Sequence, residues 1–443
     1  MNSSKLTKVV GVGALVLAVL PGLAGEQDQS EAIRKLEGQI KALQQEVEAL
    51  KKGPPRDKEA DELLTKDVFK SKGLTIGLYG EAKYRFPESG ANTFDPHRLV
   101  LLPGYQINDW LVFNSEIEFE HGGIDETTGA PGTGRSRFDG EIELEQFYVD
   151  VLINEHFNIR SLGIDLVPVG RINKYHEPTV FYSTERPELY REIIPSTWFE
   201  PGIGIFGKLT ETLDYQLMVS TGLEDFIPGS TAPGIMASDG VRNARPRLRR
   251  ANENDLAYSG RLRYQGVEGL DTSASFYVTT TPGVNQTRSM LALGDVEFLY
   301  RVPRTGLELR GDFAYWHIDR PENLVVNNNP SLTDDVGDRM YGWYVEAAYH
   351  FWPKPWSEGR GSEMDLVPFV RYSQIVTQSG LQSASELDNG TTNKDFITAG
   401  LAYFLNRNFV VKADYRRNLE GSAATENSAA NQDYFQLGVG VFF

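Results

Sequence analysis

One stretch of the sequence, residues 172–201 with the residue before it, combines charged side chains with many aromatic ones. Its candidate ion-selecting residues are Arg171, Lys174, Arg186, Arg191, Glu177 and Glu185. Guanidinium groups bind oxyanions and an ammonium group acts as a point charge, so these residues could select small ions without a covalent step. The neighbouring Tyr175, Trp198 and Phe199 are too apolar for a loop tip in water. We therefore expect the stretch to pack on an inner wall of the protein or on a neighbouring subunit.

Further charged residues alternate with apolar ones in segments far apart in the sequence. They are Lys83, Arg85, Glu116, Glu118, Glu120, Glu141, Glu143, Glu145, Lys412 and Arg416. A period of two places alternate side chains on opposite faces of a β-strand, so the charged residues share one face. If the apolar faces point outward, the glutamates form an acidic inner wall and the cations a basic one. Opposed walls would impose a transverse field on a solute, and pairing in internal salt bridges is the alternative.

Other chemical signals are weaker. A run of arginines lies in a later loop: Arg242, Arg245, Arg247, Arg249 and Arg250. The run could collect anions, contact lipopolysaccharide phosphates or simply be solvated. Because Asp334, Asp335 and Asp338 lack EF-hand spacing and the six histidines are scattered, we expect no metal site and no cofactor. No catalytic or phosphate-binding motif lies in a strand–helix context, so we expect no enzyme.

The elements that must position these residues are strands. Alternating segments lie near 74–86, 96–107, 110–121, 141–153, 162–171, 202–210, 213–222, 255–266, 270–280, 290–302, 306–318, 339–352, 364–377, 394–406, 408–418 and 433–443. Each is close to the roughly nine to eleven residues with which a tilted strand crosses a bilayer. Tight turns such as 108–109 alternate with long polar loops such as 122–140 and 223–254, as in membrane barrels. We predict an all-β fold: a transmembrane antiparallel up-and-down β-barrel of about 16 strands over residues 73–443.

The N-terminal 72 residues differ from the rest. Residues 1–24 have two lysines, an apolar core and small residues before a cleavage point, which is typical of a signal peptide. Residues 25–52 carry an apolar heptad repeat, which predicts a short α-helical coiled coil for self-association, or else a helix packed on the chain's own body. Residues 53–72 form a charged linker. An even number of strands would place both this region and the C-terminus on the short-turn side.

The C-terminal strand has a lipid-facing pattern. Phe435, Leu437, Val439 and Val441 alternate with small or polar residues, and the chain ends on Phe443. This pattern predicts a closing strand with one apolar face. A terminal phenylalanine also resembles the assembly signal of bacterial outer-membrane barrels.

Composition limits the other classes of function. The 443 residues include no cysteine, which excludes disulfides and thiolate sites. The formal net charge of −17 argues against a nucleic-acid partner. That charge alone predicts a preference for cations, but exposed charges more than about 10 Å away are screened at about 0.1 M salt. The arginines at the narrowest point are therefore expected to outweigh the total and attract anions.

Together, these features resemble the bacterial outer-membrane porins, in particular the phosphate-selective porin O and P family. The similarity is closest at 169–178, at Glu185-Arg186 and at 201–207, where a strand ends in Gly-basic-x-x-basic and glycines open the next strand. The resemblance implies a trimeric, water-filled channel in the outer membrane, in contact with lipid and lipopolysaccharide and with its coiled coil in the periplasm. Small hydrophilic solutes would diffuse through it passively, with anions such as phosphate favoured. The alternatives are a structural barrel that tethers the envelope with little conductance, and a barrel-embedded lipase.

Overall fold

The computed structural model describes most of the chain after residue 72. The described residues are 73–122, 140–226, 233–237, 239–246, 255–282, 287–328, 336–380, 392–419 and 432–443. The predicted signal peptide, coiled coil and linker lie outside them, as do Arg247, Arg249, Arg250, Asp334 and Asp335. Within the described ranges, every helix is too short or too polar to cross a membrane.

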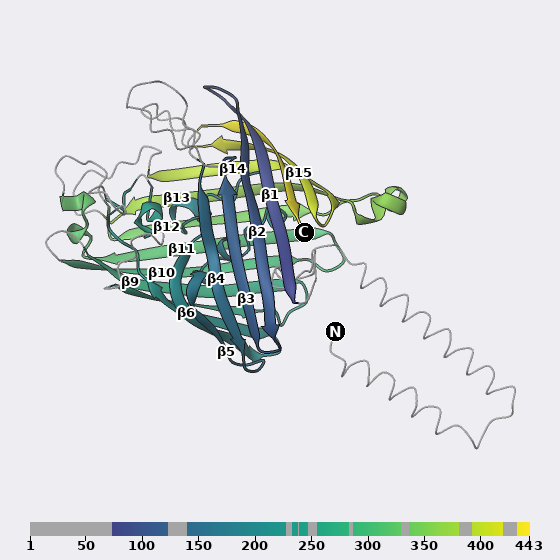
Figure 1. Ribbon diagram of the computed structural model, residues 1–443. Coiled ribbons are helices and arrows are strands. Elements are labelled where there is room, and N and C mark those ends of the chain that lie inside the picture. Colours follow the sequence, from purple (N-terminus) through teal and green to yellow (C-terminus); the bar gives the residue numbers. More distant parts are fainter. Residues whose placement is uncertain are drawn as a thin grey trace, which may run out of the picture. The chain divides into compact units, whose positions relative to one another are not determined.

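Sixteen antiparallel strands close into a barrel in which each strand pairs with its neighbours in sequence and β1 pairs with β16 (Figure 1). The strands are β1 Leu74–Pro87, β2 Thr93–Asn108, β3 Leu111–Glu120, β4 Ile142–Leu152, β5 Asn158–Leu166, β6 Phe199–Thr210, β7 Leu213–Thr221, β8 Leu256–Tyr264, β9 Leu270–Pro282, β10 Arg288–Arg301, β11 Leu307–Asp319, β12 Arg339–Tyr349, β13 Asp365–Ser379, β14 Asn393–Asn406, β15 Phe409–Asn418 and β16 Tyr434–Phe442. The predicted fold class and strand number are confirmed.

Short helices occur only in connections among the described residues. They are α4 Arg171–Lys174, α5 Leu189–Glu192, η1 Arg242–Ala244, η3 Pro321–Asn323, η4 Val326–Asn328, η5 Lys354–Trp356 and η6 Gly359–Glu363. Two of them, α4 and α5, lie between β5 and β6, in the stretch that holds the candidate ion-selecting residues.

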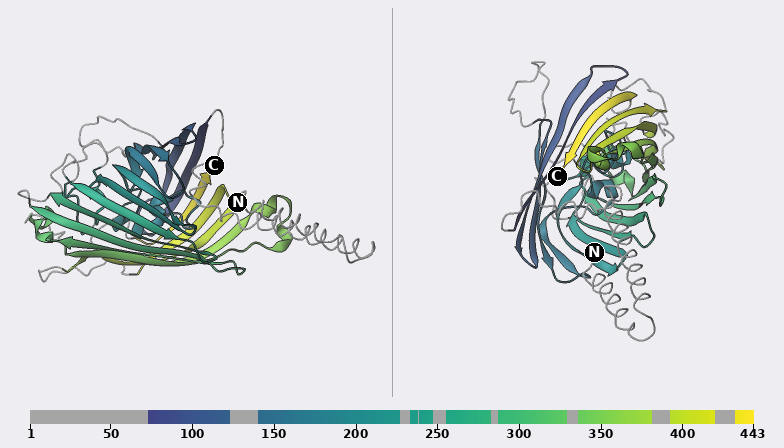
Figure 2. Two further views of the ribbon diagram at one scale, coloured as in Figure 1. Left: turned by 90° about the horizontal axis from the view of Figure 1, so that it is seen from below. Right: turned by 90° about the vertical axis from the view of Figure 1, so that its right-hand side faces the viewer.

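The two faces of the wall have opposite character, as the alternating sequence predicts. On β16, Phe435, Leu437 and Val439 are about 40% exposed, whereas Gln436 between them is fully buried. Large apolar side chains are exposed in the same alternating way on the other strands, which is the composition of a barrel surface that faces lipid. The inner face therefore carries the polar and charged residues. Figure 2 shows the tilted strands that make up this wall.

Hydrogen bonds between the first and last strands complete the wall. Tyr79 of β1 lies opposite Phe442 of β16, and the backbone of Phe443 exchanges hydrogen bonds with Leu78 at 2.6 and 2.8 Å. The side chain of Phe443 is 42% exposed on the outer surface. The closing role predicted for the last strand is thus visible in its pairing.

The fifth strand is placed differently from the prediction. We expected a strand at 162–171, but β5 ends at Leu166. Pro168 has no backbone N–H to continue the ladder. Val167 and Val169 have the opposite parity to Leu162, Ile164 and Leu166, so the apolar face changes at Leu166, and both valines are fully buried inside the barrel rather than in its wall.

We expect Phe443→Asp to reduce the amount of heat-modifiable barrel recovered from membranes, because a charge is placed on the apolar surface of the closing pair. The matched control is Phe276→Asp, which puts the same charge on the outer face of β9. A larger loss with Phe443→Asp than with the control supports a role of the terminus in assembly. Equal losses would contradict it.

Candidate functional site in the barrel lumen

Residues 167–198, which connect β5 to β6 and are called the lumen segment below, lie inside the barrel. Their hydrogen-bond partners come from strands all round the wall. Glu185 accepts from Lys83 of β1 at 2.8 Å, and the backbone oxygen of His176 accepts from Arg98 of β2 at 2.7 Å. The other partners are Glu308 of β11 (to Tyr182, 2.6 Å), Ser373 of β13 (to Glu188, 2.8 Å) and Lys412 of β15 (to the backbone oxygen of Ser183, 2.9 Å). Only a segment enclosed by the wall can reach all of these strands. Of our two expectations, packing on the inner wall is the one the structure shows.

Aromatic packing holds one side of the lumen segment. Trp198 lies against Tyr277 of β9 and Trp316 of β11, with ring centroids 4.5 and 6.3 Å away, and all three side chains are fully buried. Leu223 and Leu324, from two other connections, extend the same apolar cluster. Burying side chains of this size favours the folded state by about 1.5–3 kcal/mol each. The aromatic residues of this segment, which are too apolar for a loop tip in water, therefore form part of a core inside the barrel.

Glycines make room for the lumen segment. Gly170 has a φ of 70°, and a Cβ there would lie 2.6 Å from the ring of Tyr190. On β16, a Cβ at Gly440 would lie 2.6 Å from Pro178. The Gly-Val-Gly-Val alternation of the last strand thus indicates a close inner contact as well as the lipid-facing pattern that we predicted.

Three of the candidate ion-selecting residues bind side chains of the wall strands. Arg171 forms an ion pair with Asp271, and Lys174 donates to Gln216 at 3.2 Å. Glu185 is paired with Lys83 and Arg85 at 2.8 and 2.7 Å.

The remaining three candidates have no carboxylate–cation pair in the described part of the chain. Glu177 is buried and its Oε2 lacks a hydrogen-bond partner. Arg186 donates to Thr197 at 2.8 Å, and the side chain of Arg191 is exposed. Among the described residues, neither arginine forms an ion pair with a carboxylate.

The acidic wall exists at β3 and β4. Glu116, Glu118 and Glu145 are buried on the inner face, and Glu143 lies opposite Glu118, with an oxygen within 4.8 Å of one from each of Glu118 and Glu145. The outermost pair, Glu120 and Glu141, sits at the strand ends, where the backbone N–H of Glu120 donates to Glu141 O at 2.9 Å.

The cations of β1 and β15 are bound to the lumen segment and do not form a bare basic wall. Lys83 and Arg85 share Glu185, Lys412 donates to Ser183 O, and Arg416 lies 4.0 Å from Glu188. Our expectation of opposed walls is wrong: β15, β16, β1, β2, β3 and β4 are consecutive in the closed sheet, so the two sets adjoin. The two sets cannot face each other because only one strand, β2, separates β1 from β3 in the closed sheet. These cations instead bind groups inside the lumen, which was our alternative expectation.

His176 links the lumen segment to the acidic wall. Its Nε2 lies 3.4 Å from Glu116 and 3.7 Å from Glu145. Burial would lower the pKa of His176, but the two carboxylates outweigh burial and raise the pKa to about 9. The histidines are scattered in the sequence, and nothing in their local spacing predicts this link.

The arginine run also has an unexpected partner. Arg245 donates to the carbonyl oxygen of Thr197 at 3.1 Å and is bound to Ser196 O as well. Arg245, which is partly buried, therefore attaches the connection after β7 to the lumen segment.

Comparison with known proteins places the fold. No protein-family model matches the chain. A curated relative from Aquifex aeolicus (strain VF5), named only as an uncharacterized protein, is 29% identical over 360 residues, covering 78% of this chain and 76% of the relative.

Two solved outer-membrane proteins share the architecture. Salmonella typhi OmpF in complex with daunomycin has a TM-score of 0.52 at 14% identity over 85% of this chain and all of that one. The loop L8 deletion mutant of Vibrio cholerae OmpT has a TM-score of 0.50 at 11% identity over 84% of this chain and all of that one. The chain therefore has the barrel fold of these bacterial outer-membrane proteins.

We expect the contribution of His176 to stability to depend on pH. Because its pKa is raised on folding, the ion pair stabilises the protein fully below the ordinary value of 6.5 and is lost as pH rises through about 9. The groups that face His176 are Tyr79, Arg98, Glu116 and Glu145. The measurement is the midpoint of thermal unfolding in detergent, from pH 6 to pH 10.

The control is His176→Gln, which keeps every other titrating group. The difference in midpoint between the wild type and this variant should shrink as pH rises through about 9. A difference that is constant with pH would contradict a charged His176 at neutral pH.

Proposed function

We propose that the chain forms a water-filled channel in a bacterial outer membrane, through which small hydrophilic solutes diffuse past the lumen segment. The observation that carries the proposal is a charged segment folded across the inside of a closed barrel. The apolar outer face supports a place in lipid. Selection in such a channel depends on its width and on the charges at its narrowest point.

We propose further that this narrow point attracts anions such as phosphate, although the whole chain is acidic. Arg171 pairs with Asp271, a carboxylate that it shares with Arg263, so we rest the attraction on Arg186 and Arg191, which form no ion pair among the described residues. The exposed surface of Arg191 belongs to a segment enclosed by the wall and therefore faces the water inside the barrel. A guanidinium there binds a planar or tetrahedral oxyanion through paired N–H groups.

The double variant Arg186→Gln, Arg191→Gln should shift the reversal potential in asymmetric salt toward cations and relieve block by phosphate. A charge about 4 Å from an ion in water is worth about 1 kcal/mol, so the permeability ratio should change about fivefold. Arg407→Gln, an exposed change in the turn after β14, removes one positive charge without touching the lumen segment. If the double variant behaves like this control, general diffusion replaces anion selection.

A homo-oligomer, and a trimer in particular, is the assembly that we propose from the resemblance and the heptad repeat at 25–52. Deleting residues 25–72 should leave a folded barrel but lower the share of oligomer in native gels or light scattering. Loss of the barrel itself would show that the region has a role beyond association.

A barrel with little conductance, serving to tether the envelope, is the second candidate. The apolar cluster around Trp198, Tyr277 and Trp316 favours it, because it fills part of the lumen. Conductance in planar bilayers distinguishes the two: steps in current support the channel, and their absence with correctly folded protein supports the tether.

A further inference from the structure

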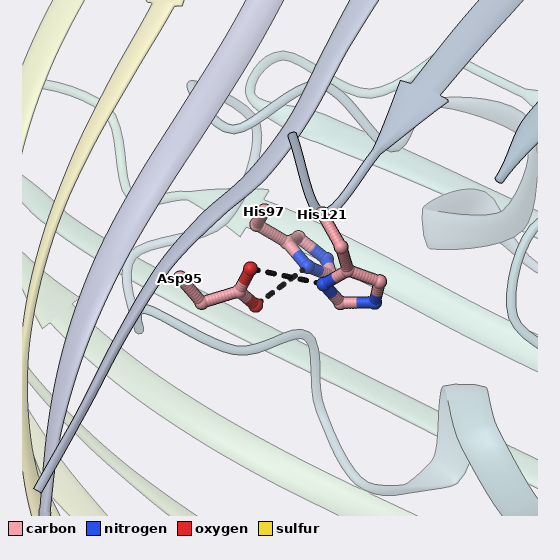
Figure 3. A group of neighbouring side chains, drawn as sticks. All are labelled: Asp95, His97 and His121. Atoms are coloured by element: carbon pink, nitrogen blue, oxygen red, sulfur yellow. Dashed lines mark hydrogen bonds and ion pairs between the residues drawn. The ribbon is translucent and has the colours of Figure 1, made fainter. Parts of the chain in front are cut away.

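Two histidines and an aspartate meet at one end of strands β2 and β3. In Figure 3 both imidazole rings are directed toward the carboxylate of Asp95. His97 Nδ1 lies 3.2 Å from Asp95 Oδ2, and His121 Nδ1 lies 2.9 Å from Asp95 Oδ1. The two ring centroids are 5.5 Å apart, and one possible ligand atom from each of the three residues lies within 4.8 Å of the others.

The backbone brings the three side chains together through two local irregularities. Glu81 pairs with Arg98 and Lys83 pairs with Asp95, so Pro96 and His97 together face one residue of β1 in a β-bulge. The other irregularity is the φ of 50° at His121, whose backbone N–H donates to His97 O at 2.8 Å. Left-handed backbone costs a non-glycine residue about 1–2 kcal/mol, so the surrounding contacts hold His121 in place.

The chemistry of this group suits a transition-metal ion. Two imidazole nitrogens and one carboxylate oxygen are ligands for Zn²⁺, Cu²⁺ or Ni²⁺, whereas Ca²⁺ and Mg²⁺ prefer oxygen alone. Three protein ligands leave a fourth position for water or a solute. The side chains of Asp95, His97 and His121 are 24, 23 and 42% exposed, so an ion can reach them.

We propose that Asp95, His97 and His121 form a binding site for a divalent transition-metal ion, with Zn²⁺ as the reference, at the inner rim of the barrel. Asp95 pairs with Lys83, whose ammonium binds Glu185 of the lumen segment, so the site lies on the inner face. Glu81 approaches His97 Nε2 to 3.8 Å but is engaged by Arg98 at 2.7 Å. The site goes beyond solute diffusion, and it differs from our sequence-based expectation of no metal site.

A second cluster of side chains is an alternative place for a metal ion to bind. Glu116, Glu145 and His176 also gather within 4.8 Å, and both oxygens of Glu145 lack hydrogen-bond partners. That group is fully enclosed, and its histidine is an ion-pair partner of the two carboxylates. It has one imidazole rather than two, so it fits a transition metal less well.

The test is calorimetric titration of Zn²⁺ into the full-length protein in detergent, purified without a polyhistidine tag and stripped with a chelator. The wild type should bind one ion per chain at this site. His97→Gln and His121→Gln should each weaken binding by at least about 100-fold, since losing a ligand costs more than losing a partner outside the ligand shell. Each variant is first checked for heat modifiability, so that a folding failure is recognised.

His156→Gln is the matched control, because His156 is an exposed imidazole 3.5 Å from a single carboxylate, Glu155. It should bind Zn²⁺ like the wild type. With Cu²⁺ as a probe, electron paramagnetic resonance should show two nitrogen ligands in the wild type and one in His121→Gln. Unchanged binding in both histidine variants overturns the proposal, as does a loss of binding in Glu145→Gln alone, which would assign the metal to the enclosed group.

Discussion

The closure of the sheet between β1 and β16 is the constraint on which the rest of the structure depends. An open edge would leave a row of backbone N–H and C=O groups unpaired, and a bilayer offers them no water. Once the wall is closed, alternate side chains must enter a bounded interior. The polar residues of one strand face are then no longer at a surface; they are enclosed, and every charge among them needs a partner.

The lumen segment supplies many of those partners, and its backbone matters as much as its side chains. Arg98, Arg310 and Lys412 come from three different strands, and they donate to the carbonyl oxygens of His176, Val180 and Ser183. A non-helical stretch of chain has carbonyl groups to spare, and cations on the wall satisfy them. The wall and the segment therefore hold each other in place: the cations fix the segment through its carbonyl oxygens, while Arg98 and Arg310 also pair with wall carboxylates, Glu81 and Glu308.

Much of this fold can be predicted from the sequence, because the segments in which apolar and polar residues alternate are long, regular and repeated along the chain. The inward faces of Glu116, Glu118 and Lys412 could be predicted from alternation alone. The features that could not be predicted lie where the alternation is broken, or where apolar residues that look like part of a strand lie in a connection. The bulge at Pro96 and His97 shifts the register by one residue, and at Val167 the apolar residues change to the opposite parity, where they are buried inside the barrel.

Contacts between segments far apart in the sequence could not be predicted either. His176 meets Glu116 only because a connection folds back through the lumen, and nothing in local spacing encodes that approach. The Gly-Val-Gly-Val pattern of β16 was visible, but its meaning depends on knowing that Pro178 lies against it.

The pairing of charges inside the barrel also determines which residues can act on a solute. Lys83 and Arg85 share Glu185, and Arg171 shares Asp271 with Arg263, so each of these carboxylates offsets part of the field of two cations. The formal charge of −17 is summed over both faces and over loops, much of it too far from the lumen segment to act through salt. In the channel that we propose, selection depends on the few charges that are exposed inside the barrel and form no ion pair, and Arg191 on the lumen segment is exposed and has no ion-pair partner among the described residues.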